Sequence, residues 1–313
     1  MHRKLSTYLK DEFGEKIYRL ALSSGCSCPN RDGTLGSGGC TFCSEDGSGE
    51  FAAPFVDVNK QIEEAKKLVA GKSDARKFIA YFQSFTNTYG DAKRLRALYM
   101  ETIKREDIVI LSLGTRPDCI DDEILDMLKE LNSIKPVWIE LGLQTIHEKT
   151  ARFVNRGYEL EVFEDAYRRL KAAGITVIVH VILGLPGETK EDMLETVRYL
   201  AGLEPILDGI KLQNLQLLRG TRMYEQYQES THLGIYDGAG ENGEKIDRTM
   251  FHIMSMDEYT DLVAECIALL PDETVIHRMQ GDGPRKLLVQ PLWSLDKKRV
   301  LNMLTKKTKD FLT

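Results

Sequence analysis

Runs of β-branched and other apolar residues alternate with segments of helical periodicity along most of the chain. The apolar runs predict strands at 16–22, 78–84, 108–113, 137–143, 175–183 and 209–215. The segments between them predict helices near 57–70, 91–105, 121–132, 147–154, 161–173 and 189–202. Strands that alternate with helices are typical of a largely parallel sheet. We therefore expect an α/β fold, an open or partial (β/α)6 barrel whose reactive groups lie at the C-terminal ends of the strands.

The alternation stops after residue 218. Residues 219–256 are richer in glycine and polar residues and predict a long excursion over the barrel mouth. Beyond them the pattern predicts a helix at 257–270, a short strand at 274–278 and a basic helix at 296–312. We expect three parts, which are an N-terminal arm at 1–15, the barrel at 16–218 with a loop at 26–51, and a C-terminal α/β extension at 219–313 that closes the mouth.

Composition narrows the class of protein. A chain of 313 residues with 42% hydrophobic residues can build one large domain or two smaller ones. It contains no run of about 18 apolar residues, and its first residues lack the apolar stretch of a secretory signal, so we expect a cytoplasmic protein without membrane contact. A net charge of −6 gives no global basic surface, so a nucleic-acid partner would need a local basic patch.

Four of the six cysteines lie in GCSCPNRDGTLGSGGCTFCSEDGSGEF at 25–51. In a reducing compartment such a cluster indicates metal ligands or redox chemistry more than disulfides. Cys40 and Cys43 form a CxxC, Cys28 lies upstream of Cys40 with eleven residues between them, and Cys26 precedes Cys28 by two. A structural zinc site wants four ligands in paired knuckles, whereas this loop has one CxxC and no histidine.

Three thiolates on a glycine-rich loop can instead hold three irons of a [4Fe-4S] cluster and leave the fourth iron open to a non-protein ligand. With Cys26 as a fourth ligand, the same loop would form a closed electron-transfer site. The spacing favours the open cluster, and zinc and the closed cluster remain as alternatives.

Further motifs accompany this loop at the predicted strand ends. They are FQSFTNTYG at 82–90, LGTRPDCI at 113–120, WIELGLQTIHEKTARFVNRGY at 138–158, HVILGLPGET at 180–189 and HRMQGDGPRKLLVQPLW at 277–293. With CPNRDGTLGSGGCTFCSEDGSGEF at 28–51, the chain resembles, essentially end to end, the radical S-adenosylmethionine (SAM) superfamily and, within its elongator-catalytic-subunit-like group, the YtqA/YhcC-like family. The superfamily usually carries CxxxCxxC, and the longer first spacing is a mark of this family.

The resemblance implies a partial barrel of radical SAM type and a [4Fe-4S] cluster held by Cys28, Cys40 and Cys43, with Cys26 outside the ligand set. It implies that SAM chelates the open iron and that the reduced cluster cleaves it to methionine and a 5'-deoxyadenosyl radical, which abstracts a hydrogen atom from the substrate. A low-potential donor such as flavodoxin or ferredoxin would supply the electron.

The resemblance also assigns SAM contacts. Phe42 would pack near the adenine, and Gln144 and Arg156 match the SAM-binding glutamine and arginine of the coproporphyrinogen dehydrogenase pattern. His180 stands where that enzyme has a SAM-binding aspartate, which leaves the ribose contact open. Further contacts are expected from Gln83, Ser84, Glu140, Gly184 and Gly187. Without the resemblance, Gln144 would be interpreted as a strand cap and Arg156 as a surface arginine. His180 would be interpreted as a core histidine and the GLPG segment at 184–187 as an ordinary turn.

The substrate is less defined by the sequence. Polar residues at strand ends would line a cavity above SAM, namely Gln83, Ser84, Asn87, Glu140, Gln213, Asn214 and Gln216. His277, Arg278 and Asp282 would close its mouth or form a structural salt bridge. The family is associated with the tRNA wobble uridine, which implies removal of the carboxymethyl part of 5-carboxymethylaminomethyl(-2-thio)uridine.

A basic segment near the C-terminus offers one local patch for RNA. It would either bind tRNA phosphates or form a solvated helix face, and it contains Lys297, Lys298, Arg299, Lys306, Lys307 and Lys309. The alternatives to a tRNA enzyme are a radical SAM enzyme for a small metabolite or peptide, and a non-catalytic iron-sulfur or zinc protein.

Overall fold

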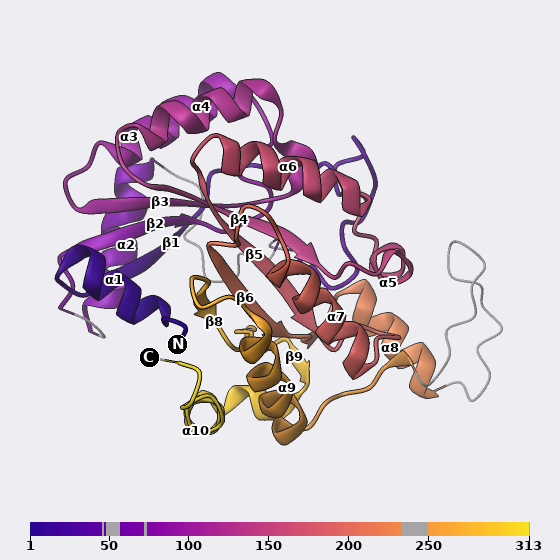
Figure 1. Ribbon diagram of the computed structural model, residues 1–313. Coiled ribbons are helices and arrows are strands. Elements are labelled where there is room, and N and C mark those ends of the chain that lie inside the picture. Colours follow the sequence, from indigo (N-terminus) through magenta and orange to yellow (C-terminus); the bar gives the residue numbers. More distant parts are fainter. Residues whose placement is uncertain (46, 48–56, 72–73, 233–249, 313) are drawn as a thin grey trace.

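The computed structural model describes residues 1–45, 47, 57–71, 74–232 and 250–312. Within this part of the chain, seven strands form one parallel sheet in the order β1-β2-β3-β4-β5-β6-β8 (Figure 1). Their bounds are β1 Ile17–Leu22, β2 Lys77–Phe82, β3 Ile108–Thr115, β4 Val137–Gln144, β5 Thr176–Leu183, β6 Gly209–Asn214 and β8 Val275–Arg278. The first six strands pair in chain order, so the predicted α/β partial barrel is confirmed.

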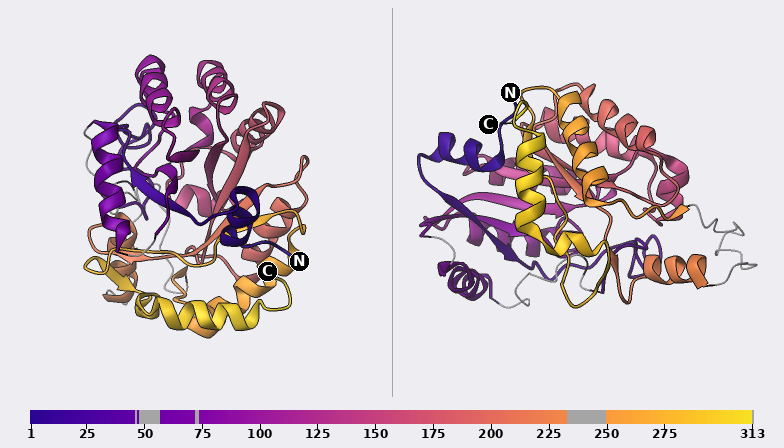
Figure 2. Two further views of the ribbon diagram at one scale, coloured as in Figure 1. Left: turned by 90° about the vertical axis from the view of Figure 1, so that its left-hand side faces the viewer. Right: turned by 90° about the horizontal axis from the view of Figure 1, so that it is seen from below.

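Helices connect the strands and cover the outer face of the sheet (Figures 1 and 2). Three of them begin where Asp57, Asp91 or Asp121 accepts a hydrogen bond from the backbone three residues on. Two more begin with capping boxes at Thr189 and Ser255. These caps explain why helix starts could be predicted closely, and the bounds are α2 Val58–Ala70, α3 Ala92–Ile103, α4 Asp122–Asn132, α5 Glu148–Phe153, α6 Leu160–Ala172, α7 Lys190–Ala201 and α9 Met256–Leu269.

Side chains at alternate strand positions point into the barrel and form layers. The lowest layer is apolar and packs against Leu9 of α1 (Leu5–Phe13), and it contains Ile17, Ile79, Ile110, Trp138 and Ile178. Two residues further along the strands, the same face carries a set of polar residues that we call the polar layer: Arg19, Tyr81, Ser112, Glu140, His180 and Lys211. The barrel is therefore closed below by apolar packing and becomes polar toward its C-terminal end.

The C-terminal part of the chain completes the sheet. The strand expected at 274–278 is β8, which lies beside β6 and so extends the predicted six-stranded barrel to seven strands. The N-terminal arm contains α1, which the sequence analysis did not predict, and Lys4 bridges to Ile276 of β8. Both chain ends lie close together, where His2 bridges to Leu312 (Figure 2).

The predicted excursion at 219–256 is only partly described. Its beginning is helical, because α8 spans Arg222–His232, and no helix was predicted there. Residues 233–249 lie outside the described part, as do residues 46 and 48–51 of the cysteine loop. The last helix, α10 Lys297–Lys307, is shorter than predicted and packs on α9. None of the described helices is long and apolar enough to cross a membrane.

Candidate active site

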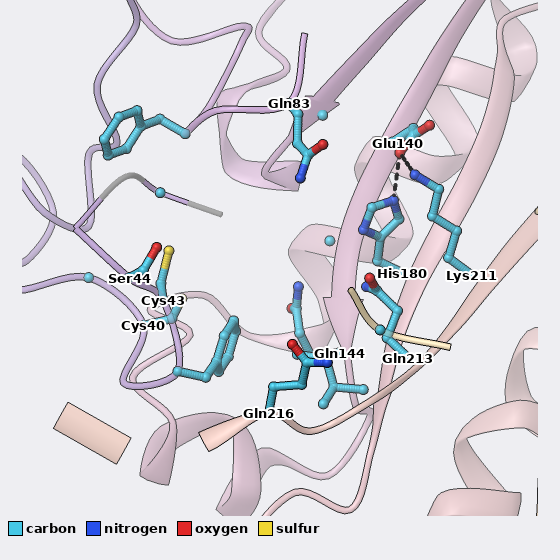
Figure 3. Close-up of a pocket in the computed structure, with 18 of the residues that line it drawn as sticks. Cys40, Cys43, Ser44, Gln83, Glu140, Gln144, His180, Lys211, Gln213 and Gln216 are labelled. Atoms are coloured by element: carbon cyan, nitrogen blue, oxygen red, sulfur yellow. Dashed lines mark hydrogen bonds and ion pairs between the residues drawn. The ribbon is translucent and has the colours of Figure 1, made fainter. Parts of the chain in front are cut away.

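A cavity of about 260 Å³ opens at the C-terminal ends of the strands. One wall is the cysteine loop that follows β1, and the opposite wall is formed by β5, β6 and β8. Figure 3 shows Cys40 and Cys43 on one side of this space and His180, Lys211 and Gln213 on the other. The loop at 281–284 lines the cavity between β8 and the C-terminal helices.

The cysteine loop is held by hydrogen bonds to the segment after α5. The Asn30 side chain donates to the backbone oxygen of Asn155 at 2.6 Å, and the Asn155 amide donates back to the oxygen of Gly39 at 2.8 Å. The Arg31 guanidinium donates to the oxygens of Cys43 and Ser44 at 3.3 and 2.7 Å. These bonds fix the loop over the strand ends although it contains little regular structure.

Cys28, Cys40 and Cys43 all line the cavity, as the resemblance implied. Burial raises the pKa of the Cys40 thiol to about 12, with a further contribution from Cys43 and opposition from Arg116. A thiolate at Cys40 is thus unfavourable without a bound positive charge, which the irons of a cluster would supply. Among the described residues, only His147, Asp192 and Glu195 bring three potential ligand atoms within 4.8 Å of one another. The three cysteine sulfurs do not, so they are spaced more widely than a single zinc ion requires.

The other cysteines lie away from this cavity. Cys26 is buried in the core, where its sulfur accepts a hydrogen bond from Arg94 at 3.4 Å. Cys28, two residues further on, lines the cavity instead, so the two sulfurs lie on opposite sides of the loop. This placement agrees with the prediction that Cys26 is not a cluster ligand. Cys266 is buried on α9, and Cys119 is half-buried.

Gln144 ends β4 in a left-handed conformation with φ of +67°. A bulge between Gly142 and Gln144 accompanies it, and the Gln144 side chain lines the cavity. A non-glycine residue in this conformation costs of order 1 kcal/mol, which is typical of positions where the backbone directs a side chain into a site. The SAM contact of Gln144 stays a prediction, and its side chain lies in the cavity where that contact would be made.

Arg156 is placed differently from the prediction. Its side chain is 1% exposed. Its guanidinium donates to the backbone oxygens of Leu143, Thr145 and Tyr158, and to Glu148 at 2.9 Å. These bonds use four of its five N–H groups, and the one that is left is too few for two-point binding of a SAM carboxylate, although Arg156 is part of the cavity lining. The expected direct contact is therefore not supported, and Arg156 instead anchors the turn after β4.

Glu140 also has another role than the one predicted. Its carboxylate is fully buried in the polar layer below the cavity, where it accepts hydrogen bonds from Ser112 at 3.0 Å, from His180 at 2.8 Å and from Lys211. Arg19 lies 3.5 Å away. Burial alone would raise the pKa of Glu140, but the surrounding cations hold it well below its ordinary value. Three of the roughly four hydrogen bonds that a carboxylate can accept are made within the polar layer, so Glu140 is a structural centre at the floor of the cavity.

His180 connects the polar layer to the cavity. Burial, with Lys211 as a second cause, lowers its pKa to about 4, so the imidazole is neutral at pH 7. The ionised Glu140 can only accept, so the ring nitrogen Nε2 that faces it carries the proton. Nδ1 is then an acceptor, and no described residue is recorded as its partner. An acceptor at this place can take the role that an aspartate would have toward a ribose hydroxyl.

The remaining predicted residues divide between the cavity and its surroundings. The described lining includes Phe42, Gln83, Gln213, Asn214, Gln216 and Arg278, and it does not include Ser84, Asn87, Gly184 or Gly187. The polar group expected near the C-terminus is split. His277 lies below the cavity against Trp138, with ring centroids 5.1 Å apart, and Asp282 pairs at the rim with Lys297 at 2.6 Å.

Several lining residues were not predicted from the sequence. Lys211 and Tyr81 face the cavity from the polar layer, and Tyr158 covers Arg156 with its ring centroid 4.5 Å from the guanidinium carbon. The lysine in the otherwise apolar strand GIKLQNL was the available signal for Lys211. A charged residue within a buried parallel strand requires a partner, and the sequence alone did not identify Glu140 as that partner.

Comparison with known proteins agrees with the fold and the cavity. The radical SAM superfamily model matches residues 28–200, and the radical SAM C-terminal domain model matches residues 243–310. The uncharacterized protein YtqA of Bacillus subtilis (strain 168) is 38% identical over 98% of this chain and 89% of its own length. Protein YhcC of Escherichia coli (strain K12) is 34% identical over 91% of this chain and 85% of its own length.

Among solved structures, the archaeal Methanocaldococcus infernus Elp3 lacking its N-terminus superposes with a TM-score of 0.65 at 16% identity, over 93% of this chain and 63% of that chain. This similarity shows a common fold. The partial barrel and its cysteine-lined cavity are those of a radical SAM enzyme, and the chain belongs to the radical SAM superfamily. Its cofactors are a [4Fe-4S] cluster and SAM.

Proposed function

We propose that this enzyme acts on tRNA and processes the C5 carboxymethylaminomethyl group of a wobble uridine to the aminomethyl form. The resemblance of the motifs implies this substrate, and one structural observation supports contact with a polyanion. A shallow depression between the loop at 281–285 and the start of α10 contains Arg285, Lys297 and Lys298, and it shares Asp282 and Gly283 with the lining of the main cavity. Arg285 and Lys298 thus place positive charge beside the opening of the site, next to Asp296 and to Lys297, which is paired with Asp282.

Residues of the cavity have distinct roles toward the cofactors. Cys28, Cys40 and Cys43 would hold the cluster, which when reduced supplies the electron that cleaves SAM to methionine and a 5'-deoxyadenosyl radical. Gln144 would bind SAM through its amide, and the Nδ1 atom of His180 would accept a hydrogen bond from a ribose hydroxyl.

The adenine would lie against an apolar wall. Phe42 packs beside a buried cluster that includes Leu215, and Phe42, Ile182, Leu215 and Leu218 all line the cavity. Such a wall excludes water from the region where a reactive radical is formed, which limits its loss to side reactions.

The six basic residues predicted for RNA contact are not equivalent. Lys297 is paired with Asp282, and Lys307 is paired with Asp261 at 2.7 Å and with Asp257. The others are exposed, with no recorded carboxylate partner among the described residues, and they are Lys298, Arg299, Lys306 and Lys309. On the helix, positions 298 and 306 lie on one face, so this face is the candidate for phosphate contact.

The test is formation of 5'-deoxyadenosine by anaerobically reconstituted enzyme with SAM and dithionite, with and without tRNA that carries the unprocessed uridine. We expect tRNA to increase product formation and nucleoside analysis to show the aminomethyl form. Cys43→Ala should abolish both results. Product formation that does not respond to tRNA would refute the tRNA substrate and direct attention to a small metabolite or peptide.

A further inference from the structure

Beyond the cofactor contacts, the wall opposite the cysteines contains an arginine that no carboxylate of the described residues neutralises. Arg278 ends β8, is half-buried and lines the cavity. Its recorded hydrogen bond goes to the Gln213 side-chain oxygen, at 3.4 Å. No ion pair within 4.0 Å is recorded for it among the described residues, although every other charged side chain of the neighbouring polar layer has one.

The local backbone explains why Arg278 faces the barrel interior. The register between β6 and β8 shifts between Ile210 and Lys211, so that Lys211 pairs with Arg278 and not with His277. The His277 ring also lies inside, because it packs over Gly209, where a Cβ atom would come within 2.7 Å of the ring. The irregularity therefore directs two consecutive residues of β8 toward the interior, and it brings the guanidinium to the level of the cavity.

The charges of the carboxylates on the lining are already compensated. Glu140 is bound by Lys211, His180 and Arg19, and Asp282 is bound by Lys297. The imidazole of His180 is neutral, and His277 contributes no charge, because burial holds its pKa well below the ordinary value. The guanidinium of Arg278 is thus a surplus positive charge at the cavity wall.

From this geometry we propose that Arg278 and Gln213 form a carboxylate-binding subsite for the substrate. This inference rests on the proposed function and names the part of the uridine substituent that the site recognises. A guanidinium binds a carboxylate through two parallel hydrogen bonds, and the Gln213 amide adds a donor beside it. The carboxylate of SAM belongs at the open iron, beside the cysteines. Figure 3 shows Gln213 on the opposite side of the cavity from Cys40 and Cys43, so the acid bound there comes from the substrate.

The test compares two anticodon stem-loop RNAs that are identical except at the wobble uridine. One carries the carboxymethylaminomethyl group, and the other carries the aminomethyl group, which lacks the carboxylate. Binding of each RNA is measured with the anaerobic holoenzyme and SAM in the absence of reductant, and 5'-deoxyadenosine formation without RNA is measured with dithionite. The proteins are wild type, Arg278→Gln, Arg278→Lys and a control, Lys286→Gln, which removes an exposed charge from the same connection outside the cavity lining.

We expect wild type and Lys286→Gln to bind the carboxylate RNA about 10- to 100-fold more tightly than the aminomethyl RNA. Arg278→Gln should lose this preference, while RNA-free SAM cleavage and binding of the aminomethyl RNA stay within about two-fold of wild type. Arg278→Lys should keep part of the preference, because it keeps the charge without the paired donors. This graded response distinguishes recognition from a general loss of structure.

Three results would overturn the proposal. Arg278→Gln could retain the full preference, or wild type could bind both RNAs equally. SAM cleavage without RNA could also fall by about 10-fold or more in Arg278→Gln, which would assign the guanidinium to SAM. A wild-type enzyme that binds neither RNA would instead contradict the proposed tRNA function, and this outcome differs from all three.

Discussion

The polar layer predicts a strong energetic coupling between Glu140 and Lys211. Both side chains are essentially buried, at 0% and 1% exposure, and the two are in direct contact. Breaking a buried pair by removing one partner typically costs about 3 to 5 kcal/mol, because the other charge stays buried without compensation. We therefore expect Glu140→Leu to lower the free energy of unfolding by about 3 to 5 kcal/mol, since it leaves Lys211 and Arg19 unpaired.

Lys211→Met should cost less. Glu140 would keep its contacts with Ser112, His180 and Arg19, so the expected loss is about 2 to 3 kcal/mol. In the double variant the charges of Glu140 and Lys211 are both absent and apolar side chains fill the space, so that only Arg19, which is 19% exposed, has lost its partner. The double variant should therefore be more stable than the sum of the single losses implies, with a coupling energy of at least about 2 kcal/mol.

The assay is urea unfolding of the reduced, metal-free protein under anaerobic conditions, followed by circular dichroism. The metal-free form keeps cluster binding from adding to the measured stability. Lys129 and Asp126 provide a control, since they pair at 2.9 Å on the surface with exposures of 49% and 75%. Their cycle should give a coupling below about 1 kcal/mol. Additive losses for Glu140→Leu and Lys211→Met would refute a central ion pair.

Three further predictions concern the cluster, the RNA surface and pH. Cys43→Ala should lose cluster iron in reconstituted protein, whereas Cys26→Ala should keep it; equal iron loss in both would contradict the ligand set. Replacing Lys298 and Lys306 together by alanine should make the slope of log affinity for tRNA against log salt shallower by about two, and an unchanged slope would exclude this face. Burial raises the pKa of Glu188 to about 7, and its Oε1 atom has no recorded hydrogen-bond partner. The folded protein then holds a proton that the unfolded chain releases near pH 4.5, so stability falls as pH rises from 5 to 8. Glu188→Gln should remove about 2 kcal/mol of that fall in urea titrations, and identical pH profiles would show that Glu188 ionises freely.

The sequence by itself determined the order of elements and the position of the cluster loop. Apolar runs and capping residues are local signals, so strand and helix positions could be predicted within a few residues over most of the barrel. Parallel strands place their C-terminal ends at one edge, and a loop that follows β1 must therefore lie at that edge with Cys28, Cys40 and Cys43.

Only the tertiary structure decided what each polar side chain does. Alternation along a strand gives the face of a residue but not its depth, so the sequence did not separate the fully buried Glu140 at the floor of the cavity from the half-buried Gln213 on its wall. The partners of Arg156 are backbone oxygens that meet in the folded turn. Arg278 reaches the site because a strand from the far end of the chain joins the sheet with an irregular register. These assignments depend on contacts between distant segments, and local patterns carry no information about them.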